Sequence, residues 1–108
     1  MQIVVHGQHI EVTEALRAYC EEKATRLGRH FDQPLDVRMQ LSLDKPRHRA
    51  EGHIKVAGGE YHADVSAETM YAAIDLLVDK LDRLLVKHKE KMVDHHRGSN
   101  PVRDGTFG

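Results

Sequence analysis

The spacing of apolar residues changes along the chain and predicts an α+β arrangement. A short β-branched run, Gln2 to His6, is typical of a strand that Gly7 closes. Thr13 then precedes apolar residues at three- and four-residue spacing, which indicates a helix with Thr13 as N-cap and Gly28 at its C-terminal exit. The buried stripe of this helix is expected to consist of Leu16, Tyr19, Cys20, Ala24 and Leu27.

From Val37 to Leu43 the apolar positions alternate, which predicts a strand with one buried face. Residues 44–47 carry turn chemistry, and the alternation resumes from Ala50 to Val56. Gly58-Gly59 predicts a two-residue turn into a third strand, because glycine tolerates the positive φ of such turns. That strand buries Tyr61, Ala63 and Val65. These three strands are expected to be consecutive and antiparallel.

The last predicted element is a long helix from Ala67 to about Met92, with Ser66 as N-cap. Such a helix is roughly 39 Å long, against about 23 Å for a seven-residue strand, so its C-terminal turns should extend beyond the sheet. Its apolar stripe ends at Leu85, apart from Met92. The residues of the stripe are Met70, Ile74, Leu77, Val78, Leu81, Leu84 and Leu85.

The order of elements, β-α-β-β-β-α, predicts a single α+β domain over residues 1–93. Two helices are expected to pack on one face of a four-stranded sheet and to leave the opposite face polar. Residues 94–108, which contain Gly98-Ser99-Asn100-Pro101, are expected to form a flexible C-terminal tail.

Composition at first argues against a polyanionic partner. The 108 residues include 16 Lys and Arg and 17 Asp and Glu, a net charge of −1. Counted by segment, however, residues 60–79 carry −5, whereas residues 45–59 and 80–97 carry +3 each. The total is therefore a cancellation between opposed patches, and it does not exclude nucleic acid.

Cysteine content and hydropathy predict a cytoplasmic protein. The one cysteine, Cys20, excludes an intrachain disulfide and a cysteine-based zinc site, and it is expected to pack in the core. No run approaches the roughly 18 apolar residues that span a bilayer, so no membrane association is expected. No signal peptide is recognisable at the N-terminus.

The end of the last helix is the strongest candidate for a binding site. Two interpretations of its basic residues stay open: they complement the helix macrodipole, or they neutralise phosphates. The second interpretation also explains why the helix continues past its apolar stripe. The basic residues of this segment are Lys80, Arg83, Lys87, Lys89 and Lys91. Additional RNA contacts are predicted from the first helix, at Lys23 and Arg26, and from the sheet, at Arg47, His48, Arg49, His53 and Lys55.

Other chemistry finds little support in the residues. Nine histidines are present, but close groupings such as His6 with His9 and His95 with His96 match no known metal-ligand spacing. No nucleophile with an adjacent base is recognisable, so neither a metal, nor a cofactor, nor an enzymatic activity is expected. Tyr71 is expected at the edge of the core.

Two stretches of the last helix, Met70 to Asp75 (MYAAID) and Lys87 to Lys91 (KHKEK), resemble the final-helix signature of the bacterial ribosome hibernation promoting factors. The segment EVTEALR, from Glu11 to Arg17, and the glycine pair of the hairpin are similar to the same family. The resemblance covers about residues 1–92. Members of this family are also labelled sigma-54 modulation proteins.

The resemblance implies a fold similar to double-stranded-RNA-binding domains and a position on the small ribosomal subunit. There the protein would occupy the mRNA channel and the A and P sites during stationary phase or stress, in competition with mRNA, tRNA and initiation factors. It would block initiation and promote inactive ribosome dimers, alongside a small ribosome modulation factor, and would be a monomer off the ribosome. The rRNA-binding positions that it implies are Lys23, Arg26, Lys80, Arg83, Lys87, His88, Lys89 and Lys91.

Two alternatives remain open. The chain extends beyond the usual end of the short form, and a tail-bearing type within the family prevents ribosome dimerisation. The other alternative is a protein-interaction module that modulates a sigma factor through the acidic 60–79 segment or the basic helix end.

Overall fold

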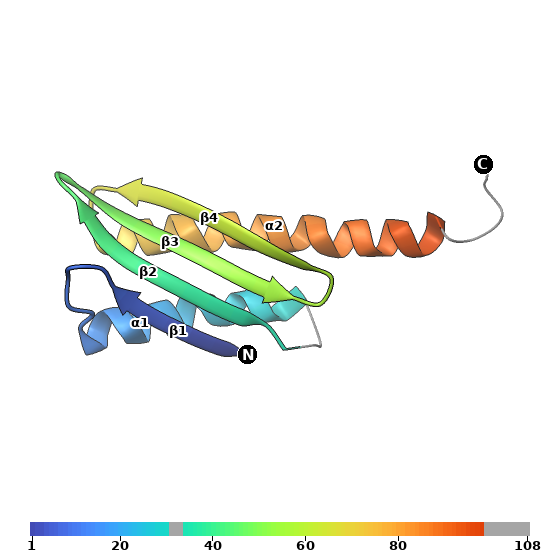
Figure 1. The fold of residues 1–108 in the computed structure, drawn as a ribbon, viewed down its shortest axis with the longest axis horizontal. Coiled ribbons are helices and arrows are strands. Elements are labelled where there is room, and N and C mark those ends of the chain that lie inside the picture. The colour runs from blue at the N-terminus through green and yellow to red at the C-terminus, as the bar shows by residue number, and fades with distance from the viewer. Residues whose placement is uncertain (31–33, 99–108) are drawn as a thin grey trace.

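The computed structural model describes residues 1–30 and 34–98. It confirms the predicted α+β class and the β-α-β-β-β-α order (Figure 1). The elements are β1 (Gln2–Gly7), α1 (Glu14–Ala24), a 3-10 helix η1 (Thr25–His30), β2 (Asp36–Asp44), β3 (Arg47–Val56), β4 (Gly59–Ala67) and α2 (Met70–Gly98).

The four strands form one mixed sheet in the order β1-β2-β3-β4. β1 runs parallel to β2, with Val4 opposite Arg38, because the intervening α1 returns the chain to the same end of the sheet. The β2–β3 and β3–β4 pairs are antiparallel, as predicted. Both helices lie on the same face of the sheet, so the other face is left open (Figure 1).

α2 closes the core against β3 and β4. Its buried side chains recur every three or four residues and include Ile74, Leu77, Leu81 and Leu85, all 0% exposed. The helix comes so close to β3 that a Cβ atom at Gly52 would lie 2.7 Å from Leu81 Cδ1. The prediction for this apolar stripe is therefore confirmed, with Leu84 partly buried at its margin.

The predicted N-cap of the last helix, Ser66, is wrong. β4 continues to Ala67, which pairs with His48, so the helix cannot begin until the strand has ended. Thr69 is the cap: its Oγ1 accepts from the Ala72 amide at 3.1 Å, and its carbonyl accepts from the Ala73 amide at 3.0 Å. α2 consequently begins at Met70 rather than at Ala67.

The first helix keeps its predicted start but not its predicted end. Thr13 Oγ1 accepts from the Leu16 amide at 3.2 Å, which confirms the N-cap. The α-helix stops at Ala24 and continues as η1, so Gly28 lies inside a 3-10 helix instead of ending an α-helix. The tighter winding still leaves Leu27 fully buried.

Two details of the sheet differ from expectation. Val56 pairs with Gly59, so the turn between β3 and β4 is Ala57-Gly58, where Gly58 has a φ of 88°. Leu43 is 44% exposed although it continues the buried alternation of β2. It lies next to the β2–β3 turn, which extends past the start of α2 (Figure 1).

α2 runs to Gly98, beyond the predicted end at about Met92, and it extends past the sheet (Figure 1). Residues 94–98, predicted as the start of a flexible tail, are therefore helical, whereas the rest of that predicted tail, 99–108, lies outside the described residues. No helix in the described part of the chain is long and apolar enough to cross a bilayer.

Candidate nucleic-acid interface

Four exposed basic residues of α2 form a single line, here called the basic stripe. Its members, at spacings of three, four and four residues, are Lys80, Arg83, Lys87 and Lys91. Residues with these spacings lie one above another on a helix, over about 16 Å of axis from first to last. The stripe therefore presents a continuous row of positive charge along one flank of α2.

Lys89 does not belong to this row. At about 100° per residue it lies roughly 200° around the helix from both Lys87 and Lys91. It falls on the flank that carries Asp75, about four turns earlier, on the side of α1. The predicted basic segment is thus split between two flanks of one helix.

Arg83 of the stripe already has an acidic neighbour. Its Nη2 lies 2.6 Å from Asp79 Oδ2, one turn earlier, and the Arg83 side chain is 75% exposed. Exposed ion pairs of this kind contribute at most about 1 kcal/mol, so Arg83 can exchange its carboxylate for a phosphate at little cost.

The prediction that His88 contacts RNA is wrong, because His88 is only 4% exposed. Its Nε2 lies 3.0 Å from the Ala57 carbonyl oxygen, which can only accept, so Nε2 donates. Its Nδ1 forms a second hydrogen bond with the Tyr61 hydroxyl, at 2.6 Å. His88 is therefore a buried contact between α2 and the β3–β4 turn.

The sequence does hold a signal for this buried histidine. His88 follows Leu81 and Leu85 at spacings of four and three residues, so it continues the buried stripe by one turn. Because histidine is polar, a search for apolar residues alone does not include His88 in this stripe. The partners that satisfy the ring, the Tyr61 hydroxyl and a backbone carbonyl, lie 27 and 31 residues away in the chain.

Lys23 of α1 lies in a cluster that joins the two helices. The Tyr19 hydroxyl donates to Asp75 Oδ1 at 2.7 Å, and this hydrogen bond is the main reason that the pKa of Tyr19 rises to about 12. Lys23 Nζ lies 3.9 Å from the same carboxylate and 5.4 Å from the centre of the Tyr19 ring. Tyr71, 43% exposed, packs edge-on against Tyr19 with ring centres 4.8 Å apart. Lys23 is thus partly neutralised, whereas Arg26 in η1 is exposed.

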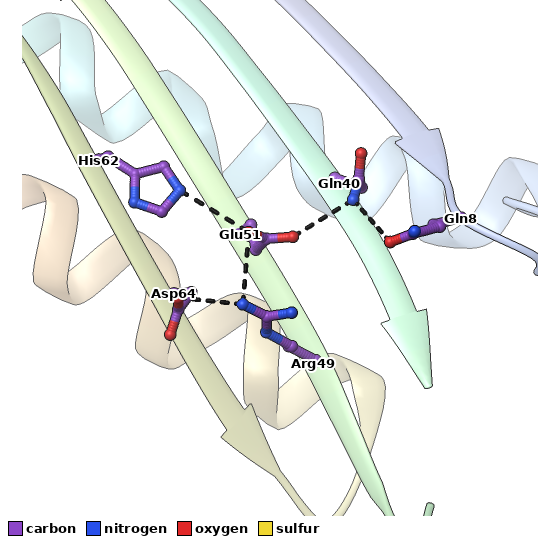
Figure 2. A network of polar contacts seen from close by, with 6 residues as sticks. All are labelled: Gln8, Gln40, Arg49, Glu51, His62 and Asp64. Carbon is purple, nitrogen blue, oxygen red and sulfur yellow. Dashed lines mark hydrogen bonds and ion pairs between the residues drawn. The ribbon is translucent and has the colours of Figure 1, made fainter. Parts of the chain in front are cut away.

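The open face of the sheet carries its own network of compensated charges (Figure 2). Arg49 Nη2 lies 3.1 Å from Asp64 Oδ2 and 3.4 Å from Glu51 Oε1, and the Asp64 hydrogen bond raises the pKa of Arg49 further. Glu51 also accepts from Gln40 Nε2 at 3.2 Å and lies 3.7 Å from His62 Nε2. The basic groups here are balanced by acids on neighbouring strands.

Three of the other additional contacts predicted on the sheet are also engaged, whereas His48 Nδ1 is buried with no hydrogen-bond partner among the described residues. Lys55 Nζ and His53 Nε2 lie 3.6 and 3.9 Å from carboxylate oxygens of Glu60. Arg47 donates to the Ser66 carbonyl oxygen at 3.1 Å. The open face lies opposite the helices (Figure 1), so the structure does not bring these three residues together with the basic stripe.

Cys20 lies in the core, as predicted, with no exposed surface. Burial raises the pKa of its thiol to about 11, which keeps it protonated and poorly nucleophilic. Within residues 1–30 and 34–98, no group of three or more His, Cys, Asp or Glu side chains is placed to hold a metal ion.

A four-stranded sheet backed by two helices, the longer of which carries the basic stripe, defines a small α+β module with a row of positive charge on one helix. The chain belongs to the family described as "Sigma 54 modulation protein / S30EA ribosomal protein", whose sequence profile matches residues 3–93. The expected family and the non-enzymatic class are thereby confirmed.

Curated relatives and solved structures agree with this assignment. The chain is 46% identical over 102 residues to the ribosome hibernation promoting factor of Azotobacter vinelandii, covering 94% of this chain and 95% of the relative. It is 42% identical over 95 residues to that of Escherichia coli (strain K12), covering 88% and 100%. Its fold is similar to the Thermus thermophilus Protein Y N-terminal domain, with a TM-score of 0.78, 35% identity and 82% and 99% coverage. A ribosomal subunit interface protein from Coxiella burnetii gives a TM-score of 0.74 at 27% identity, with 83% and 99% coverage.

Proposed function

We propose that this protein is a cytoplasmic translation inhibitor that binds the small ribosomal subunit. It occupies the mRNA channel and the A and P sites during stationary phase or stress. In that position it competes with mRNA, tRNA and initiation factors, and it makes and breaks no covalent bond. The names of the relatives, which include ribosome hibernation promoting factors and a ribosomal subunit interface protein, support this proposal.

The basic stripe is the observation that carries the proposal. Lys80, Arg83, Lys87 and Lys91 are exposed in one row. His88, next to Lys87, contacts the β3–β4 turn at the edge of the sheet, and α2 extends past the sheet (Figure 1). Cations in such a row neutralise successive phosphates and release their counterions. Contacts of this type recognise the shape of an RNA backbone more than its sequence.

Lys89 extends the proposed rRNA-binding surface to the other flank of α2, and we add exposed Arg26 of η1 to this surface. Lys23 of α1 joins it when its carboxylate partner yields to a phosphate. The outer surface of α2 lies between the flank that carries the basic stripe and the flank that carries Lys89. His88 is excluded from this surface because it is buried. Arg47, Arg49, His53 and Lys55 are left out because they lie on the open face of the sheet, opposite the helices (Figure 1).

Co-sedimentation with isolated small subunits tests the proposal. We expect Lys87→Glu combined with Lys91→Glu to weaken binding at least about a hundredfold, since two phosphate contacts become repulsions. Lys45→Glu combined with Lys55→Glu changes the net charge equally on the sheet and is expected to bind as the wild type does. Equal loss in both double variants would show that net charge, rather than the stripe, determines binding.

Competition and salt provide a second test. Excess mRNA with initiator tRNA should displace the protein from the subunit. Binding through about six phosphates should weaken roughly a thousandfold between 50 and 200 mM salt. A weak salt dependence would favour the alternative protein-interaction module, in which the acidic segment contacts a protein such as a sigma factor.

The effect on ribosome pairing forms a separate part of the proposal. We propose that the protein promotes inactive ribosome dimers together with a ribosome modulation factor. Sucrose gradients of starved cells that express the full chain or a version ending at residue 93 test this. Dimers with both versions support it, whereas dimers only after truncation would assign the chain to the type that prevents pairing.

A further inference from the structure

The last lysines of α2 stand on either side of a buried histidine. Lys87 and Lys89 are exposed, whereas His88 between them is 4% exposed. Successive residues of a helix point about 100° apart. Therefore, when His88 faces the sheet, Lys87 and Lys89 are directed to opposite flanks of the helix, and the rotation of α2 about its own axis is fixed at this turn.

The His88 ring is held by two hydrogen bonds and by packing. Nε2 lies 3.0 Å from the Ala57 carbonyl oxygen, and Nδ1 lies 2.6 Å from the Tyr61 hydroxyl. The ring also packs against that of Tyr61, with centroids 5.3 Å apart and planes at 74°. Gly59 lies directly beneath: a Cβ atom there would lie 3.3 Å from His88 Cε1. All these partners belong to the β3–β4 turn and the start of β4.

Among the described side chains of α2, Leu85 is the last fully buried apolar one before His88. The apolar stripe ends at Leu85, and Lys87 and Lys91 carry like charges at four-residue spacing, an arrangement that weakens a helix. A helix end that buries little apolar surface opens readily, because most helical stability in proteins comes from tertiary packing. A contact to the sheet at His88 opposes this opening.

We propose that His88 is a positioning residue for ribosome binding, an inference that rests on the proposed function above. It fastens the turn of α2 that carries these lysines to the β3–β4 turn and thereby fixes the directions of Lys87, Lys89 and Lys91 before the RNA is met. The RNA then binds lysines that are already placed, instead of having to order a locally opened stretch of α2.

Amide hydrogen exchange and small-subunit affinity of the same variants test this. We expect His88→Ala to increase exchange in residues 86–91 while residues 77–81 stay protected, and to weaken binding roughly tenfold with a shallower salt dependence. Tyr61→Phe removes one hydroxyl and keeps the ring packing. It should also increase amide exchange in residues 86–91 and weaken binding, but by less than His88→Ala. His88→Gln, whose amide can still donate to the Ala57 carbonyl, should restore part of the affinity. Val5→Ala, a core truncation in β1 away from this contact, controls for lost stability.

The outcomes separate the two proposals. Wild-type affinity and salt dependence in His88→Ala would overturn the role of His88, as would an equal loss of affinity in Val5→Ala. If His88→Ala does not fold, unchanged exchange and affinity in Tyr61→Phe would overturn it instead. If Lys87→Glu with Lys91→Glu binds as the wild type does, the basic stripe itself fails, and the inference fails with it.

Discussion

Arg83 lies 2.6 Å from Asp79, one turn earlier on α2, so one of the four cations in the basic stripe is paired with an acid of the same helix. The pair marks the boundary between the acidic first half and the basic second half of α2. An approaching phosphate has to compete with Asp79 for the guanidinium and is repelled by the Asp79 charge.

Asp79→Asn should consequently strengthen binding to the small subunit. The change removes the competing charge and keeps the shape of the side chain, and exposed pairs contribute only about 0.2–1 kcal/mol, so we expect a gain of a few-fold with little change in stability. Affinity at two salt concentrations measures it. Weaker binding of this variant would mean that Asp79 helps to hold Arg83 in position.

The identity of the α2 cap predicts different effects for two similar residues. Thr69→Ala should lower the free energy of unfolding by about 1 kcal/mol, because the Ala72 amide loses its acceptor. Ser66→Ala should have a smaller effect, because Ser66 lies in β4 opposite Arg49. Urea denaturation of both variants provides the comparison, and a larger loss for Ser66→Ala would place the start of the helix earlier than observed.

Gly52 is needed for the close approach of α2 to β3. Gly52→Ala should destabilise the fold by about 1–3 kcal/mol, since the new Cβ would lie 2.7 Å from Leu81 Cδ1 and 3.2 Å from Leu77 Cδ2, both in fully buried side chains. Thermal and urea unfolding measure the loss. A neutral effect would show that the leucines can repack without moving the helix.

Cys20 predicts a dependence of stability on alkaline pH. The pKa of the thiol is about 11 in the folded protein, against an ordinary 9.0, so the unfolded chain loses this proton first. The contribution of the protonated Cys20 thiol to the free energy of unfolding is fully present below about pH 9 and is lost as the pH rises towards 11. The difference in urea midpoint between wild type and Cys20→Ala should therefore shrink over this interval. A constant difference would contradict the shift.

The same burial predicts slow alkylation of the folded protein. At pH 8 the thiol is protonated and inaccessible, so iodoacetamide should label Cys20 only after denaturation. Mass spectrometry of samples with and without urea measures this, and rapid labelling of the folded protein would show that α1 opens from the core.

The sequence allowed the element order and the apolar stripe of α2 to be predicted because both follow from local periodicity. The start of α2 could not be predicted in this way: Ser66 and Thr69 are both suitable caps, and only the pairing of Ala67 with His48 shows that the strand is still continuing at Ser66. The β3–β4 turn is shifted by one residue for the same reason, since strand register is a property of two segments.

Charge patterns allowed the exposed lysines to be predicted but not their partners. Arg49 and Lys87 are both basic residues in segments with a net positive charge. In the structure, however, Arg49 lies between Asp64 and Glu51 on the open face of the sheet. The family resemblance implies that His88 contacts RNA, whereas the Tyr61 hydroxyl and the Ala57 carbonyl oxygen supply hydrogen bonds that allow its ring to be buried. These contacts join distant segments and cannot be recognised from local periodicity.

The dual role of α2 has a consequence for the order of events during synthesis. α2 follows all four strands in the chain, and it supplies both the side chains that close the core over β3 and β4 and the row of cations. Until it has emerged, the growing chain has neither a closed core nor the basic stripe. If the proposed function holds, we therefore expect a nascent copy to have no affinity for the ribosome that is translating it, so that the protein cannot arrest its own production midway.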